Sequence, residues 1–261
     1  MIQNLLKEKL KTGEAAAGMF MTCNAPDLVE IAAIAGFDFV IIDGEHGPMG
    51  PESIQGMIRA AEVRNITPIV RIPNHLESSV LHNLDIGAHG LQIPQVNDAK
   101  TAETLIGYGK YEPIGHRGIA FPRAADYGMS DGYFEHENKE TMFVMHCENE
   151  KCLENLEEIC RNPEVDVIFL GPYDMSQSMG ITGQVNHPKV EAAASKVLEI
   201  CKKYGKVAGI YCGSGDYCGS GEIARKRREQ GFRYLAIGMD ITAFAAKCRE
   251  EIKGFRGEEI L

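Results

Sequence analysis

Ionisable side chains that could do chemistry stand at the ends of several short apolar runs of this chain. Glu45 and His46 follow one run, in the string Asp43-Gly-Glu-His. A histidine beside carboxylates suits general acid–base catalysis, because its unperturbed pKa lies near neutral pH; a solvated polar turn is the alternative. Arg71 stands near the end of another run. We expect it to hold a carboxylate or a developing enolate oxygen, and the alternative is a structural ion pair with a nearby carboxylate.

Two more carboxylates, Glu148 and Asp174, follow two later apolar runs. If these runs are neighbouring parallel strands, both carboxylates leave the same end of the sheet and can share one small cation. Oxygen ligands favour Mg²⁺ or Mn²⁺, and two protein ligands leave about four octahedral positions for water and a 2-oxo acid. Such a metal would act as a Lewis acid that stabilises an enolate. An exposed turn aspartate and a helix N-terminal glutamate are the alternative.

Two other chemistries are less consistent with the sequence. His146 and Cys147 are close enough to suggest zinc, but neighbouring side chains of a strand point to opposite faces. A Schiff base needs a lysine at the site, and no lysine ends an expected strand on its carboxyl side. The sequence therefore favours a metal-dependent lyase.

The apolar runs alternate with segments of helical periodicity, and their continuous apolar character suits parallel strands buried on both faces. Eight such units in 261 residues predict one (β/α)8 TIM-barrel domain over residues 1–261, and no glycine fingerprint of an open doubly wound sheet follows the first run. In such a barrel the active site lies at the carboxyl ends of the strands. The expected strands are Ala17–Thr22, Phe39–Asp43, Pro68–Ile72, Gly90–Pro94, Met142–Cys147, Val165–Leu170, Val207–Tyr211 and Tyr234–Gly238.

Two segments stand apart from this alternation. The long connection from Tyr111 to about Thr141 is a candidate lid, because long loops in compact domains are usually functional or mobile. The tandem hexapeptide within Tyr211–Glu222 is either a glycine-rich phosphate loop or a local duplication that makes a flexible loop.

The composition limits the classes of partner. The formal charge is 27 − 37 = −10, without a basic run, which disfavours nucleic acid and anionic membrane surfaces. No stretch approaches the ~18 apolar residues of a membrane span. The first eighteen residues lack the apolar segment of an export signal, and the eight cysteines form no C-x-x-C pair. We therefore expect a cytoplasmic enzyme with reduced thiols.

Taken together, several motifs resemble those of the HpcH/HpaI aldolases. These motifs are IIDGEHGP, IVRIP, LQIPQV, GHRG, a glutamate at the fifth strand exit and IFLGPYDMSQSMG, in order between about residues 10 and 245. The family comprises class II, metal-dependent pyruvate aldolases, including 4-hydroxy-2-oxoheptanedioate and 2-keto-3-deoxy-rhamnonate aldolases. The resemblance implies a modified barrel whose last helix is exchanged between subunits, usually in a homohexamer.

The same resemblance assigns roles to the ionisable residues. It makes Glu148 and Asp174 the ligands of a divalent cation, which would be Mg, Mn or Co. It makes His46 the acid/base, oriented by Asp85, much as the aspartate of a serine-protease triad orients its histidine. Arg71 would polarise the keto oxygen of the bound pyruvate moiety.

Other positions would shape the pocket. By resemblance, Glu45 supports a water network beside the base, and the backbone of Gly171 and Pro172 lies beside pyruvate. Phe20 stands where a tryptophan is frequent in the family, and Tyr173 stands where alanine is frequent. We expect both aromatic side chains to contact the substrate.

These observations predict reversible aldol cleavage of a 4-hydroxy-2-oxo acid to pyruvate and an aldehyde, so the expected partner is a small 2-oxo acid. Oxaloacetate decarboxylation is the nearest rival, because it needs the same stabilised enolate but no base for a hydroxyl. A citramalyl-CoA-type lyase is disfavoured, since no basic patch for a CoA phosphate chain is evident. A metabolite-binding barrel without catalysis would have little use for a general base.

Overall fold

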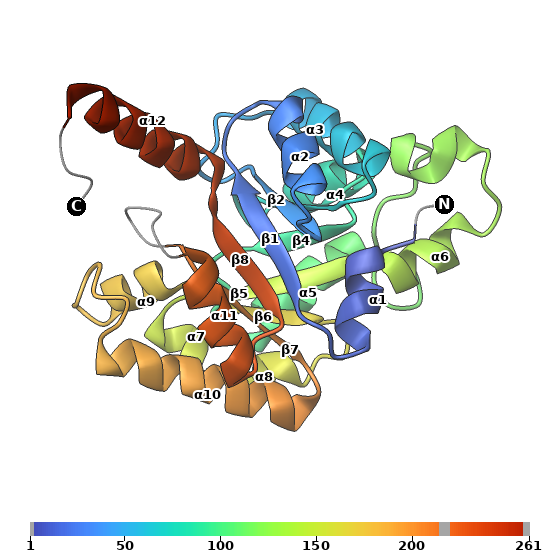
Figure 1. The fold of residues 1–261 in the computed structure, drawn as a ribbon. Coiled ribbons are helices and arrows are strands. Elements are labelled where there is room, and N and C mark those ends of the chain that lie inside the picture. Colours follow the sequence, from blue (N-terminus) through green and yellow to red (C-terminus); the bar gives the residue numbers. More distant parts are fainter. Residues whose placement is uncertain (1–2, 214–219, 258–261) are drawn as a thin grey trace.

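Eight short apolar segments form parallel strands that pair in sequence order and close into a barrel (Figure 1). The computed structural model describes residues 3–213 and 220–257. The predicted (β/α)8 fold is confirmed, and each strand lies within two residues of its expected bounds. The strands are β1 (Ala16–Met21), β2 (Phe39–Asp43), β3 (Thr67–Arg71), β4 (Gly90–Ile93), β5 (Met142–Cys147), β6 (Val167–Leu170), β7 (Val207–Tyr211) and β8 (Tyr234–Met239).

Most of the helices surround the barrel and pack against its outer face (Figure 1). Several begin with proline in the first turn, where its missing N–H costs no helical hydrogen bond. The helices are α1 (Leu5–Lys11), α2 (Pro26–Ile34), α3 (Pro51–Val63), α4 (Glu77–Asp85), α5 (Ala99–Gly109), the 3₁₀ segment η1 (Arg123–Gly128), α6 (Tyr133–Glu140), α7 (Glu150–Glu154), α8 (Leu156–Cys160), α9 (Pro172–Ser178), α10 (Pro188–Tyr204), α11 (Ser220–Gln230) and α12 (Asp240–Arg256).

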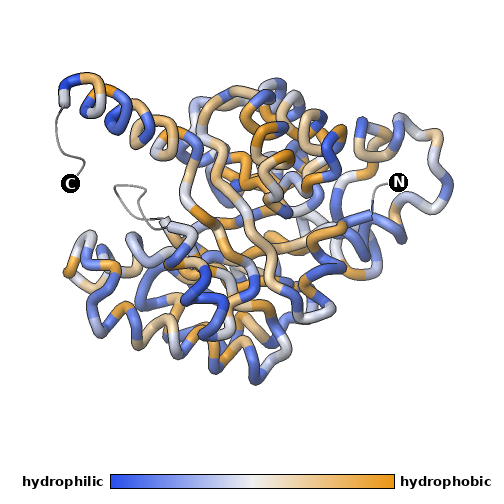
Figure 2. The backbone as a smooth tube through the Cα atoms, in the orientation of Figure 1, coloured by the Kyte–Doolittle hydropathy of each residue, from blue (hydrophilic) through white to orange (hydrophobic). Residues whose placement is uncertain are grey.

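The hydrophobic core has two layers, one inside the barrel and one between strands and helices. Inside, the ring of Tyr234 packs against Phe39 and Phe169, with centroids 4.2 and 5.8 Å apart. Outside, α3 buries Ile54, Met57, Ile58 and Ala61, which recur at helical spacing. Figure 2 shows hydrophilic and hydrophobic residues alternating along α10, as expected of a helix with one face on the barrel. Strands covered on both faces explain the continuous apolar runs of the sequence.

The connection between α5 and β5 lies at the wrong end of the barrel for the lid that the sequence suggested. A segment from a helix to the next strand runs along the amino-terminal rim, whereas the carboxyl ends of the strands form the opposite rim. The connection contains η1 and α6, and its Glu140 side chain accepts a hydrogen bond from the backbone N–H of Asn4, just before α1. It therefore cannot cover the carboxyl-terminal rim of its own barrel.

Helix α12 leaves the barrel directly after β8 and projects away from it (Figure 1). Its Phe244 and Phe255 side chains are 74% and 87% exposed. Such apolar exposure on a projecting helix is compatible with exchange between subunits, which stays a prediction.

Three further predictions concern membrane-spanning helices, the cysteines and the tandem hexapeptide. No described helix is long and apolar enough to cross a membrane. All seven cysteines within residues 3–213 and 220–257 are free, as expected of reduced thiols. Most of the tandem hexapeptide falls in residues 214–219, outside the described residues, so neither interpretation of it is tested.

Close packing between β4 and β5 gives a test of the barrel. A methyl group at Gly90 would lie 2.8 Å from both the Cβ and the carbonyl oxygen of Met142. We therefore expect Gly90→Ala to lower the free energy of unfolding by about 1–3 kcal/mol, measured by urea denaturation. Gly56→Ala in α3 is the matched control, because nothing lies within 4 Å of its added methyl group. A Gly90→Ala variant as stable as the control would contradict this packing.

Candidate active site

A cavity of about 280 Å³ opens at the carboxyl-terminal rim of the barrel. It gathers side chains that are far apart in the sequence and that leave different strands. Five residues that sequence reasoning did not assign to the site also line it, namely His146, Phe169, Tyr211, Met239 and Thr242. Eight residues predicted for the site line this cavity, namely Phe20, His46, Arg71, Glu148, Gly171, Pro172, Tyr173 and Asp174.

The exit of β2 is shaped by the buried carboxylate of Asp43. Its Oδ1 accepts the backbone N–H groups of Glu45 and His46, at 3.1 and 3.2 Å. These bonds fold the chain into a tight turn that places His46, an exposed residue, at the mouth of the cavity. Burial opposes ionisation of Asp43, but Arg71 and the two N–H groups outweigh it, so the pKa of its carboxyl lies below the ordinary value.

Arg71, at the end of β3, forms ion pairs with Asp43 and Glu45. A structural ion pair was the alternative to a substrate contact in the sequence analysis. The Nε and Nη2 of Arg71 donate to the two oxygens of Asp43 at 2.8 and 2.6 Å, and its Nη1 lies 3.1 Å from Glu45 Oε2. The guanidinium also lies over the ring of Phe20, 4.8 Å from the ring centre. Arg71 is thus rigidly held beside the cavity, with most of its charge already balanced.

Glu148 and Asp174 stand on either side of Gly171. A methyl group at Gly171 would lie 3.3 Å from Glu148 Oε2 and 3.6 Å from Asp174 Oδ2, so the glycine leaves open the space that both carboxylates face. Burial and the charge of Glu148 raise the pKa of Asp174 above its ordinary value. Asp174 forms no ion pair with any residue in the described part of the chain. Neither carboxylate forms an ion pair with a lysine or arginine of the described residues, and such a pair of carboxylates is suited to a divalent cation.

The described residues offer such a cation two ligands and no more. Within residues 3–213 and 220–257, no group of three or more His, Cys, Asp and Glu side chains is arranged to hold a metal ion. An open site, in which substrate and water complete the coordination, needs fewer protein ligands than a closed structural site, and Glu148 and Asp174 are its predicted ligands. The zinc alternative is also weakened, because Cys147 belongs to the outer core while His146 lines the cavity.

The structure does not bring Asp85 to His46 within one chain. Asp85 is the last residue of α4, at the amino-terminal end of the barrel, and it accepts a hydrogen bond from the buried Arg117 at 2.7 Å. Asp85 therefore does not contact His46 within one chain, and its role in orienting that histidine stays a prediction. The resemblance implied a role for Asp85 but not its position relative to the two rims of the barrel.

His146 is the most informative residue that sequence reasoning missed. It is buried in the barrel interior, and its Nδ1 lies 2.8 Å from Glu148 Oε2. The signal was available, because His146 follows Met142 and Val144 at two-residue spacing and both belong to the interior cluster.

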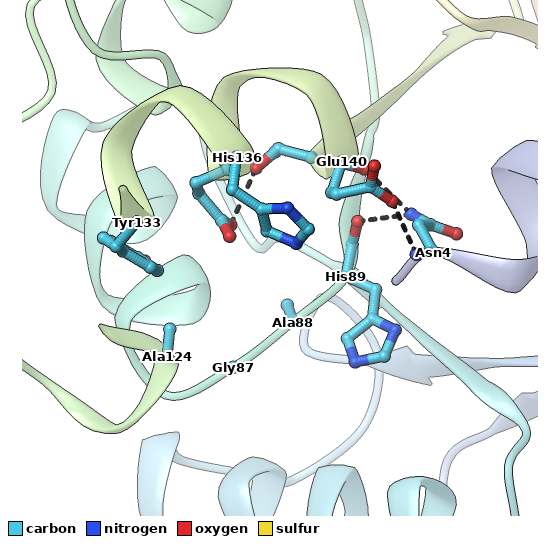
Figure 3. Close-up of a pocket in the computed structure, with 10 residues that line it drawn as sticks. Asn4, Gly87, Ala88, His89, Ala124, Tyr133, His136 and Glu140 are labelled. Carbon is cyan, nitrogen blue, oxygen red and sulfur yellow. Dashed lines mark hydrogen bonds between the residues drawn. The ribbon is translucent and has the colours of Figure 1, made fainter. Parts of the chain in front are cut away.

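A second, much smaller cavity, of about 30 Å³, lies at the amino-terminal rim (Figure 3). Its polar groups mainly join elements of the fold. The Asn4 side chain donates to the carbonyls of His89 and Glu140, at 2.8 and 3.0 Å, and so ties the start of α1 to β4 and α6 (Figure 3). The predicted acid–base and carboxylate residues lie in the other cavity, which is therefore the candidate active site.

Comparison with known proteins agrees with the motifs. The family model for HpcH/HpaI aldolase/citrate lyase matches residues 16–246. The chain is 34% identical over 256 residues to a hydroxypyruvate/pyruvate aldolase of Pseudomonas aeruginosa, covering 97% of this chain and 93% of the relative. It is 28% identical over 258 residues to a 2-keto-3-deoxy-L-rhamnonate aldolase of Salmonella gallinarum, with 98% and 94% coverage.

A solved structure is similar over the whole barrel. An HpcH/HpaI aldolase/citrate lyase family protein from Burkholderia cenocepacia superposes with a TM-score of 0.90 at 29% identity. The match covers 97% of this chain and 100% of that one. The family resemblance inferred from the motifs is thereby confirmed.

The buried pair of Asp43 and Arg71 yields a prediction about stability and pH. Asp43→Asn leaves a largely buried guanidinium with one partner fewer, so we expect it to lower the free energy of unfolding by about 3–5 kcal/mol at pH 7. Because the pKa of Asp43 is lowered in the folded state, this contribution is present above the ordinary carboxyl pKa and is lost as the pH falls through the folded value.

Denaturant titrations of wild type and Asp43→Asn between pH 8 and pH 4 measure this difference. It should stay constant down to about pH 5 and shrink at more acidic pH. Glu229→Gln, which breaks the exposed pair with Arg225, is the control and should change stability by less than about 1 kcal/mol. A difference that grows as the pH falls would contradict the assignment.

Proposed function

Because the chain belongs to the HpcH/HpaI aldolase/citrate lyase family and is an aldolase-type carbon–carbon lyase, we propose that it cleaves a 4-hydroxy-2-oxo acid reversibly to pyruvate and an aldehyde, with a divalent metal cation as cofactor. One observation carries this proposal. Two carboxylates, neither of them paired with a described lysine or arginine, flank Gly171 in the same cavity as an acid–base histidine and an arginine.

We propose Glu148 and Asp174 as the residues that hold the cation. Their oxygen donors favour Mg²⁺ or Mn²⁺, with Co²⁺ a further candidate. When bound, the cation supplies a Lewis acid that polarises the keto oxygen and stabilises the enolate of pyruvate. It would also balance two negative charges, which otherwise disfavour an anionic 2-oxo acid in this cavity.

The residues of the chain supply the remaining parts of the reaction. His46, at the cavity mouth, takes the proton of the 4-hydroxyl as the C3–C4 bond breaks and the aldehyde forms. The electron pair of that bond becomes the enolate of pyruvate, and a proton added at C3 completes the product. Arg71 holds the keto oxygen on which negative charge develops, and its contacts with Asp43 and Glu45 fix its direction.

The walls of the cavity position the substrate. Gly171 and Pro172 begin α9 beside the carboxylates, so the pyruvate half lies against their backbone. Phe20 and Tyr173 both contact Tyr211, with ring centres 5.8 and 6.1 Å apart, and this aromatic wall faces the aldehyde half. Glu45 keeps the water network beside His46, and burial raises the pKa of its carboxyl.

Exchange of α12 in a homohexamer belongs to the same proposal. The exposed phenylalanines of α12 support it, because large apolar side chains on a projecting helix are stabilised when a partner covers them.

Removal of the metal tests the cofactor. Chelation should abolish pyruvate release from a panel of 4-hydroxy-2-oxo acids, followed with lactate dehydrogenase, and Mg²⁺ or Mn²⁺ should restore it. Glu148→Gln and Asp174→Asn keep the side-chain size but remove the charge, and we expect kcat/KM to fall by about a thousandfold or more. Glu150→Gln, an exposed substitution two residues away, is the control. Pyruvate release at the wild-type rate by Glu148→Gln or Asp174→Asn after chelation would contradict the proposal.

Substitution of His46 separates aldol cleavage from decarboxylation. His46→Gln should slow aldol cleavage by about 10²–10⁴-fold, because the 4-hydroxyl loses its base. Oxaloacetate decarboxylation needs no such base and should persist in the variant. His82→Gln, an exposed position on α4, serves as the control. A wild-type enzyme that decarboxylates oxaloacetate but releases no pyruvate from any hydroxy acid would favour the decarboxylase instead.

A further inference from the structure

A chain of buried polar side chains runs beneath the two carboxylates, through the interior of the barrel. The Tyr234 hydroxyl on β8 donates to Gln92 Oε1 on β4 at 2.7 Å. Gln92 Nε2 lies 2.8 Å from His146 Nε2 on β5, and His146 Nδ1 lies 2.8 Å from Glu148 Oε2. Tyr234 and Gln92 are fully buried, and His146 and Glu148 are 2% and 3% exposed. Hydrogen bonds in such surroundings are costly to leave unmade.

The direction of each bond follows from chemistry. Because the Tyr234 hydroxyl donates to the amide oxygen of Gln92, the amide nitrogen of Gln92 faces His146. An amide nitrogen can donate but not accept, so His146 Nε2 must be the acceptor. The single ring proton then sits on Nδ1, where it donates to Glu148. The network therefore matches the tautomer that carries its proton on Nδ1.

Both oxygens of Glu148 are fixed by this arrangement. Oε2 accepts from His146, and Oε1 accepts the backbone N–H of Gln95 at 2.7 Å. Gln95 has φ of 55°, in the left-handed region that non-glycine residues rarely adopt. The ring of His146 is itself held against Phe169, with centroids 4.9 Å apart. The carboxylate can thus present its remaining lone pairs in one direction, toward the open space at Gly171.

We propose that His146 is a positioning residue, which the Tyr234–Gln92 pair holds in one tautomer so that Glu148 is preorganised for the cation. The inference rests on the proposed metal site and goes beyond it, because it assigns the affinity of that site partly to side chains that do not ligate the ion. His146 itself is no ligand, since both of its ring nitrogens are engaged. Partners of this kind typically change metal affinity or activity by about 10–100-fold.

Calorimetric titration of the metal-free protein with Mn²⁺ tests this inference without any substrate. His146→Leu should weaken Mn²⁺ binding by about 10–100-fold. His146→Asn should recover most of that loss, because the asparagine amide can occupy the place of Nδ1 and donate to Glu148. Saturating Mn²⁺ should restore much of kcat in His146→Leu, since a positioning residue touches no reacting atom.

Two further variants separate positioning from general damage. Val144→Ala removes buried interior volume from β5, two residues before His146, so it reports destabilisation alone and should keep the wild-type Kd. Gln92 does not itself line the cavity, and its hydrogen bonds are to His146 and Tyr234, so weaker Mn²⁺ binding in Gln92→Leu would act through His146. It also provides the test if His146→Leu does not fold.

The outcomes are distinct. Weak binding by His146→Leu and Gln92→Leu, with recovery in His146→Asn and no change in Val144→Ala, supports the inference. A wild-type Kd in both His146→Leu and Gln92→Leu, or equal weakening in Val144→Ala, overturns it while the metal site stands. Absence of Mn²⁺ binding by the folded wild type overturns the proposed function together with this inference.

Discussion

The approach of two carboxylates across Gly171 is the constraint on which the rest of the site depends. Glu148 and Asp174 follow β5 and β6, adjacent strands whose pairing of Cys147 with Leu170 brings both exits to the same level of the rim. A side chain at Gly171 would fill the space between them. The guanidinium in this cavity, that of Arg71, is already bound to Asp43 and Glu45. Further positive charge would favour an anionic substrate in this cavity. The proposed divalent cation would supply it and would find there the oxygen ligands that it prefers.

The rigidity of the site comes from strands and from turns pinned by buried groups. Asp43 fixes the turn that carries His46 and also the direction of Arg71, so one buried carboxylate sets two of the proposed reacting groups. Glu148 is fixed in the same manner by His146 and by the Gln95 backbone. Such preorganisation matters because electrostatic stabilisation is strongest when the charged groups need not move during the reaction. The aromatic wall of Phe20, Tyr211 and Tyr173 bounds the part of the cavity where aldehydes of different kinds would lie.

Much of the fold and of the site could be predicted from the sequence, for identifiable reasons. Continuous apolar runs predict the strands, because both faces of a barrel strand are covered. The residues after each run predict the site, because the carboxyl ends of all strands meet at one rim. The position of Asp85 at the end of α4 could not be predicted, since a motif carries no information on which rim a helix end occupies. The connection containing η1 and α6 was taken for a lid for the same reason. The chain from Tyr234 through Gln92 to His146 joins three strands distant in sequence, so spacing along the chain could not reveal it.

Exchange of the methyl protons of pyruvate for deuterium, followed by NMR, tests the central claim most directly, because it requires the enolate but no aldehyde. The metal-loaded wild-type protein in D₂O should exchange the C3 protons, the exchange should stop after chelation, and Mg²⁺ or Mn²⁺ should restore it. Exchange that continues undiminished after exhaustive chelation, or no exchange by folded protein in the presence of either metal, would contradict a cation held by Glu148 and Asp174 as the centre of the reaction.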